Sequence, residues 1–278
     1  MKKIIPSICM LLVTAVLMGT STYAWFSMNK KVEVTGMKVT ASTSSNLVIS
    51  KDKITFEDST KFNDYTLPFT DATAKLNPVS SINGKQFFKA NAPALKPEES
   101  TLPTGAEFEE AANTSTEIYY IEKTIYIAVK GVTDLGQLSV SADIEHDKKP
   151  GQESTSLTTE QKAIYKALRI AVAYVDDTTE SALDEKAATL LTANTEKTSW
   201  EGAKDAGPVA DNKQTVSATA IKNSATITAL NTLTANKCYR LVVRIWLEGQ
   251  DENCFANNAN AAAKVLSSAS ISLVFTAA

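Results

Sequence analysis

The sequence has few of the residues on which most enzyme chemistry depends. It contains a single histidine, His146, which lies in the charged run HDKK. A Ser-His-Asp or Cys-His site would have to use that histidine, and no serine lies in a G-x-S-x-G motif. The ten glycines form no phosphate-binding loop. We therefore expect a protein that is not an enzyme and uses no cofactor, with His146 in a solvated loop.

Cysteine is equally scarce, with three residues in the chain. These cysteines and one histidine supply no His/Cys zinc site. Cys9 lies in the apolar N-terminal segment, so a disulfide would have to join Cys238 to Cys254. Cys238 opens a predicted strand of about ten residues, or ~33 Å, whereas the return from Glu248 to Cys254 reaches at most ~20 Å. We expect two unbridged cysteines, with the disulfide as the alternative.

The chain also has no excess of basic residues, with 28 Lys and Arg against 31 Asp and Glu. This balance argues against nucleic-acid binding, which needs a basic patch. One acidic run, EGQDEN at 248–253, follows a predicted strand and is a weak calcium candidate through Glu248, Asp251 and Glu252. It lacks the fixed spacing of an EF-hand loop, so we expect a turn and no metal.

The N-terminus has the form of an export signal. Two lysines at 2–3 precede an apolar run at 4–19. That run has about 16 residues, fewer than the roughly 20 that a membrane-spanning helix needs. We therefore predict an N-terminal signal helix within 1–24 and a secreted chain, with membrane contact only through an uncleaved leader.

The end of this leader offers a cleavage site. Thr22, Tyr23 and Ala24 place small residues at the two positions that signal peptidase reads. Cleavage after Ala24 makes Trp25 the new N-terminus. The partner expected here is a signal peptidase, and the mature chain is 25–278.

Alternating apolar residues dominate the mature chain and predict a mainly β protein. Strands are expected at 32–41, 46–50, 116–130, 137–145, 167–175, 237–248 and 265–276, with two lighter strands within 214–230. The predicted core is led by Leu241, Val243, Ile245, Ile271, Leu273 and Phe275. Strands with one apolar and one polar face indicate an antiparallel β-sandwich forming a single domain.

Two segments depart from this pattern. Leucines at helical spacing predict one short helix within 179–195. Residues 57–115 are polar and proline-containing, and they predict a long loop insertion.

One strand face is a candidate ligand surface. Arg240, Arg244 and Trp246 share the outward side of 237–248, where they form a basic and aromatic stripe that suits a glycan. The alternative, which we favour, is cross-strand pairing with partial cover by the helix or the insertion.

The processing region resembles that of the TasA and camelysin family, exported proteins of Gram-positive bacteria with a dedicated signal peptidase. The resemblance rests on T-Y-A-W-F-S at 22–27, preceded by G-T at 19–20 and followed by the strand-like VEVTGMKVTA at 32–41. NPVSSINGKQFF at 77–88 and VVRIWLEGQDENC at 242–254 also look like phrases of a related clostridial group. The resemblance implies a jelly-roll-like sandwich that polymerises when the freed N-terminal segment adds as a strand to the next subunit.

This resemblance assigns a role to the new N-terminus. The donor strand it implies contains Trp25, Phe26, Val32, Val34, Met37 and Val39. The competing interpretation is that 32–41 forms the first strand of the chain's own sandwich. We expect a self-associating structural protein of the cell surface or extracellular biofilm matrix; the alternative is a monomeric surface protein that binds carbohydrate or protein.

Overall fold

The computed structural model describes a discontinuous set of segments from Lys38 onward. These are residues 38–43, 46–62, 76–91, 107–114, 117–146, 167–176, 184–192, 201–203, 213–215, 221–249 and 269–277. The predicted signal segment 1–24 and its predicted cleavage site lie outside them. So do Trp25, Phe26, Val32, Val34 and Met37 of the predicted donor strand.

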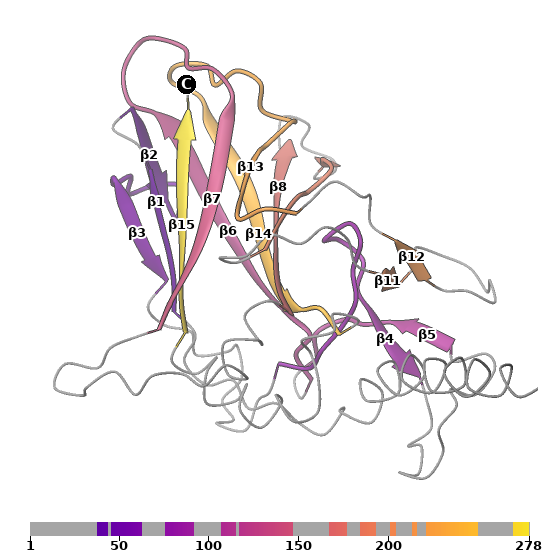
Figure 1. Ribbon diagram of the computed structural model, residues 1–278. Helices are drawn as coiled ribbons and strands as arrows, with labels where there is room; N and C mark the ends of the chain where they lie inside the picture. The colour runs from indigo at the N-terminus through magenta and orange to yellow at the C-terminus, as the bar shows by residue number, and fades with distance from the viewer. Residues whose placement is uncertain are drawn as a thin grey trace, which may run out of the picture.

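Within these segments the regular secondary structure is almost entirely β-strand, as the alternating pattern predicts (Figure 1). The strands are β1 Lys38–Thr43, β2 Leu47–Ser50, β3 Ser59–Phe62, β4 Phe88–Asn91, β5 Glu107–Glu110, β6 Tyr120–Val129, β7 Leu138–His146, β8 Leu168–Asp176, β9 Asp184–Glu185, β10 Thr189–Thr192, β11 Glu201–Ala203, β12 Lys213–Thr215, β13 Ser224–Thr226, β14 Cys238–Leu247 and β15 Ala269–Ala277. The long predicted strands are confirmed as β6, β7, β8, β14 and β15.

Two large sheets contain most of these strands. The five-stranded sheet has the order β13-β7-β15-β1-β3, and the six-stranded sheet has β10-β8-β14-β6-β2 with β9 also paired to β8. Two small sheets pair β4 with β5 and β11 with β12. Among the ladders between these strands, pairing is antiparallel except between β1 and β15, which run parallel from Lys38↔Ser270 to Thr43↔Phe275. The expectation of antiparallel sheets therefore holds for every ladder but this one.

Eight of the strands pair in a nested order along the chain. Taken in sequence as β1, β6, β7, β8, β10, β13, β14 and β15, the first pairs with the last, the second with the seventh, the third with the sixth and the fourth with the fifth. Two further ladders, β7 with β15 and β8 with β14, join neighbouring pairs.

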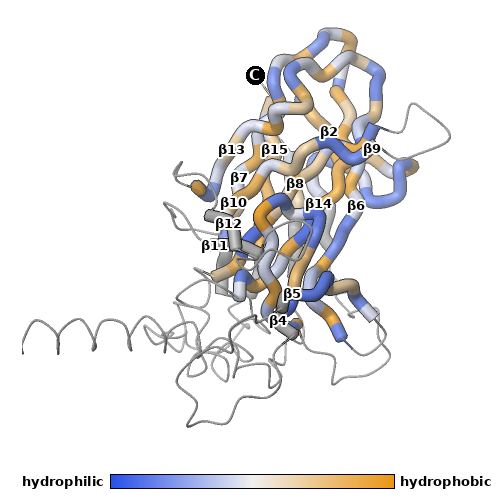
Figure 2. The backbone as a smooth tube through the Cα atoms, turned by 90° about the vertical axis from the view of Figure 1, so that its right-hand side faces the viewer, coloured by the Kyte–Doolittle hydropathy of each residue, from blue (hydrophilic) through white to orange (hydrophobic). Residues whose placement is uncertain are grey.

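A single large hydrophobic cluster draws on both sheets. It combines Leu138, Val140 and Phe275 of the five-stranded sheet with residues of β2, β6, β8 and β14. The six predicted core residues, from Leu241 to Phe275, are all at most 2% exposed, which confirms the assignment of strand faces. Apolar segments follow the strands of both sheets in Figure 2.

The predicted helix within 179–195 is wrong. The described part of this stretch forms β9 and β10, and Leu190 and Leu191 pair with Ala171 and Ile170 of β8. Leucine pairs at this spacing suit either a helix or a strand. Helix propensity is a weak preference that burial against a neighbouring strand overrides. Here β10 continues the six-stranded sheet beyond β8.

The predicted loop insertion at 57–115 is wrong in part. It contains β3, which ends the five-stranded sheet, and β4 and β5, which form a hairpin. Leu76, Val79 and Phe87 within it are at most 1% exposed. These apolar residues follow no regular period, because most of the stretch 76–87 lies against the face of the six-stranded sheet and not within a strand of it. Periodicity alone therefore missed them.

Candidate functional site

Residues 76–91, here called the strap, lie across the outer face of the six-stranded sheet. Val79 runs parallel to the end of β14: its N–H donates to the Leu247 carbonyl at 3.0 Å, and Gly249 N–H donates to the Val79 carbonyl at 2.9 Å. Ser80 and Phe88 then exchange two backbone hydrogen bonds of 2.9 Å, which close the loop between them. The strap therefore brings a hairpin over β6, β8 and β14.

Aromatic side chains form the apolar part of this contact. The Phe87 ring stacks on Tyr120 with centroids 4.2 Å apart and makes a T-shaped contact with Trp246, with centroids 5.3 Å apart. Trp246 is 0% exposed. A second hydrophobic cluster thus lies on the side of the sheet opposite the main core; its buried members are Val79, Phe87, Ala111, Tyr119, Ala171 and Trp246.

The tip of the strap approaches the sheet closely at Gly84. A Cβ atom added there would lie 2.3 Å from Cβ of Ala171 on β8, and Gly84 has a φ of +68°. Glycine is the residue that tolerates both conditions. The Asn83 side chain fixes the turn, since its Oδ1 accepts hydrogen bonds from the N–H groups of Lys85 and Gln86 at 2.8 and 3.0 Å.

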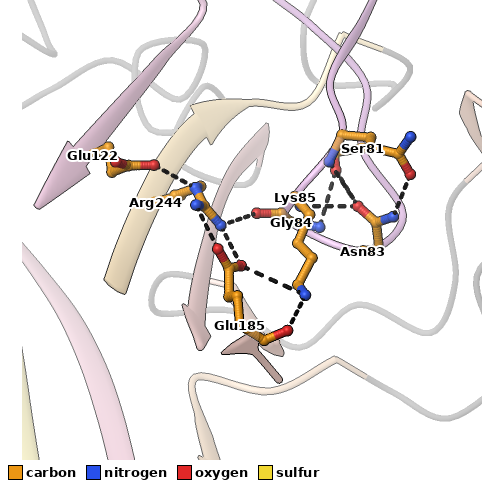
Figure 3. Close-up of polar contacts among 8 residues, drawn as sticks. Ser81, Asn83, Gly84, Lys85, Glu122, Glu185 and Arg244 are labelled. Carbon is orange, nitrogen blue, oxygen red and sulfur yellow. Dashed lines mark hydrogen bonds and ion pairs between the residues drawn. The ribbon is translucent and has the colours of Figure 1, made fainter. Parts of the chain in front are cut away.

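Arg244 forms the polar part of the contact (Figure 3). Its Nε donates to Glu122 Oε2 at 2.6 Å, and Nη1 and Nη2 donate to the two carboxylate oxygens of Glu185 at 2.6 and 2.8 Å. Nη1 also donates to the Gly84 carbonyl at 3.2 Å. Lys85 binds Glu185 from the strap side. Burial alone would lower the pKa of Arg244, but the hydrogen bonds to Glu185 and Glu122 raise it overall, so the guanidinium stays charged.

A buried carboxyl lies at the base of the strap. Glu248 is 0% exposed, and its Oε2 accepts hydrogen bonds from Trp246 Nε1 and from the Ser81 N–H, both at 3.2 Å. Burial raises the pKa of Glu248 to about 7, although Ser80, Arg169 and these two donors favour the ionised form. Arg169 on β8 is also 0% exposed and donates from Nη1 to the Leu168 carbonyl at 3.0 Å.

The structure brings two of the three predicted ligand-face residues under the strap. Trp246 is fully buried and Arg244 is engaged with Glu122 and Glu185, so neither presents an open surface to a glycan. Arg240 is half-buried near the start of β14. The alternative given above, cross-strand pairing with partial cover, describes this face: Arg244 pairs with Glu122 of β6, and the insertion covers Trp246. The stretch predicted as a helix also takes part, but as strand β9, which supplies Glu185.

Only one of the three residues of the calcium candidate lies within the described segments. Glu248 points into the protein, whereas Asp251 and Glu252 lie outside the described residues. Within the described residues, no group of three or more His, Cys, Asp or Glu side chains is placed to hold a metal. A buried Glu248 bound by two N–H donors is not arranged as a calcium ligand.

The remaining sequence predictions fall at strand ends or in β1. Val39 lies in β1, where it pairs with Ile271 and Phe62 of the same chain, so for this residue the structure favours the own-sheet alternative over the donor role. His146 ends β7 and pairs with Ala269, so it belongs to a strand and not to the predicted loop. Cys238 is half-buried at the start of β14, and Cys254 lies outside the described residues. The expectation that these two cysteines are unbridged therefore stays a prediction.

Sequence reasoning missed Gly84, Glu122 and Glu185 as partners of Arg244. The dipeptide Asn83-Gly84 is a turn signal that marks the tip of the strap. The segments 77–88 and 242–254, noted above only as similar phrases, prove to contact each other through Val79, Ser81 and the end of β14.

No family model, no curated protein and no solved structure matches this chain. In the part of the chain that the structure describes, no helix reaches the length and hydropathy of a membrane span.

Proposed function

We propose that this chain is a secreted, non-enzymatic structural protein of the cell surface or extracellular matrix, and that it is a fibre subunit built on a jelly-roll-like β-sandwich. The nested order of strand pairs supports the proposal most strongly. It is the order that two Greek keys produce when a long hairpin rolls into two facing sheets, although here the outermost pair, β1 with β15, runs parallel. One hydrophobic cluster drawn from both sheets is what such a sandwich requires. The resemblance of the processing site to the TasA and camelysin family implies the same architecture.

Assembly is proposed to use the segment ahead of β1. With Val39 in the chain's own sheet, the donor strand comprises Trp25, Phe26, Val32, Val34 and Met37. Burying each of the two aromatics in a neighbouring subunit would contribute roughly 1.5–3 kcal/mol. An end strand of a neighbour's sheet, such as β3, offers the backbone groups with which an added strand pairs.

Sedimentation velocity tests this role directly. A chain that starts at Trp25 should form oligomers whose amount rises with concentration, whereas a chain that starts at Lys31 should stay monomeric because it lacks both aromatics. The matched control is Val132→Ser in the longer chain, since Val132 is 88% exposed in a loop and takes no part in the donor segment. Equal assembly from Trp25 and from Lys31 would remove the donor role.

The alternative, a monomeric surface protein that binds carbohydrate or protein, needs an open ligand face. The candidate face has Trp246 at 0% exposure beneath the strap. A carbohydrate that bound the full chain only through this face would have to displace Phe87 first. The fibre subunit is therefore the function we prefer.

A further inference from the structure

The strap is fixed to the sheet through a carboxyl that has no contact with water. Glu248 Oε2 accepts one hydrogen bond from Trp246 on its own strand and one from the Ser81 N–H on the strap. The side chain is 0% exposed. Placing an ionised carboxylate in such a position costs free energy unless partners compensate, whereas a neutral carboxyl is tolerated more easily. Lifting the strap would remove Ser81 and admit water to the carboxyl.

We propose that the strap is a pH-dependent cover, attached while Glu248 is protonated and loosened when Glu248 ionises, so that the face containing Trp246 and Arg244 is uncovered. The proposal concerns the attachment of residues 76–91 to the sheet. It is independent of whether the protein forms fibres.

The groups around Glu248 determine at which pH its carboxyl ionises. Arg169 of β8 is the charged residue whose field reaches the carboxyl, and it favours ionisation. The strap contributes Ser80 and Ser81, and β14 contributes Trp246, all as uncharged partners. The ion pairs of Arg244 lie elsewhere on this face, where Glu122 and Glu185 hold the guanidinium. Glu248 is therefore the group of this cluster that changes charge near neutral pH.

The direction of the effect follows from the raised pKa. With the strap closed, the pKa of Glu248 is about 7, against a value of 4.5 for a solvated glutamate. The closed form binds the proton more tightly, so its advantage is fully present below pH 4.5 and is lost as the pH rises to about 7. Across this window the equilibrium constant for opening should rise by up to about two orders of magnitude and then level off.

Hydrogen exchange measured by mass spectrometry on the full chain tests the cover. After correction for the intrinsic pH dependence of exchange, protection of peptides from residues 76–91 should fall as the pH rises from 4.5 through about 7 and become constant roughly one pH unit above that. Peptides from β7, which belongs to the five-stranded sheet, should show no such change. Glu248→Gln keeps the shape of the side chain and removes the titration, so its strap protection should not vary with pH.

A second carboxyl variant shows whether the effect belongs to Glu248, and the wild-type pH profile tests the proposal even if Glu248→Gln does not fold. Asp143→Asn changes an exposed carboxyl on β7, in the five-stranded sheet, and its strap should keep the wild-type pH profile because the strap lies on the six-stranded sheet. Constant protection of 76–91 in the wild-type chain across the window would overturn the proposal, even if Glu248→Gln did not fold. The same pH profile in wild type and Glu248→Gln would overturn it as well.

Discussion

At the scale of single residues, the structure assigns several polar groups of one face to holding the strap in place. Arg244 donates to Glu122, Glu185 and the Gly84 carbonyl, and so connects β6, β9 and the strap through one planar guanidinium. The sequence identifies Arg244 by its place on an alternating strand. It does not identify Glu185 as the partner, because 59 residues separate the two and no local pattern links them.

Gly84 offers the sharpest prediction at this scale. Gly84→Ala should lower the free energy of unfolding by about 2–4 kcal/mol, because a Cβ at 2.3 Å from Ala171 overpacks the contact and alanine is strained at positive φ. Urea titration followed by circular dichroism measures the loss. Gly131→Ala is the control: Gly131 has a φ of +125° but lies in an exposed loop with no atom within 4 Å, so the loss there should be smaller.

A double variant separates the contact from the backbone strain. Ala171→Gly removes the atom that the new Cβ would meet, so the combination with Gly84→Ala should recover part of the loss beyond additivity. Strictly additive losses would contradict the close approach of the strap to β8.

At the scale of elements, β14 organises the six-stranded sheet. It pairs antiparallel with β6 on one side and with β8 on the other, so its inward residues lie at the centre of the main core. Alternation in the sequence is enough to predict this strand and its two faces. It does not reveal that β8 is buried on both faces, since Arg169 and Ala171 of β8 are covered by the chain around the strap and not by the main core.

Ile245 tests the assignment of faces on β14. Ile245→Ala should lower the free energy of unfolding by roughly 2–5 kcal/mol, since the side chain is 1% exposed in the main core. Val274→Ala on β15 is the matched control: this valine is 36% exposed on the outer face, and its truncation should change stability by about 0.5 kcal/mol or less. A denaturant titration in which Ile245→Ala loses less than about 1 kcal/mol would show that the faces are reversed.

At the scale of the whole molecule, strand positions and core faces could be predicted from the sequence, but the partners of the strands could not. The nested pairing joins β1 to β15 across most of the chain, and the parallel direction of that ladder has no local signature. The spacing of the two leucines in β10 fits a helix and a strand equally well, and only the pairing of β10 with β8 decides between them. The candidate site is the hardest part to predict from the sequence. The strap and β14 are far apart along the chain and meet through tertiary contacts, such as those of Val79 and Ser81 with the end of β14.

The central claim is that cleavage frees an N-terminal segment through which copies of the chain assemble into fibres. Negative-stain electron microscopy of the purified chain starting at Trp25, at neutral pH, is the most direct measurement. The account predicts filaments of regular width that disappear when Trp25 and Phe26 are both changed to serine. Only monomers from the unchanged chain, or filaments equally abundant after the double change, would contradict it.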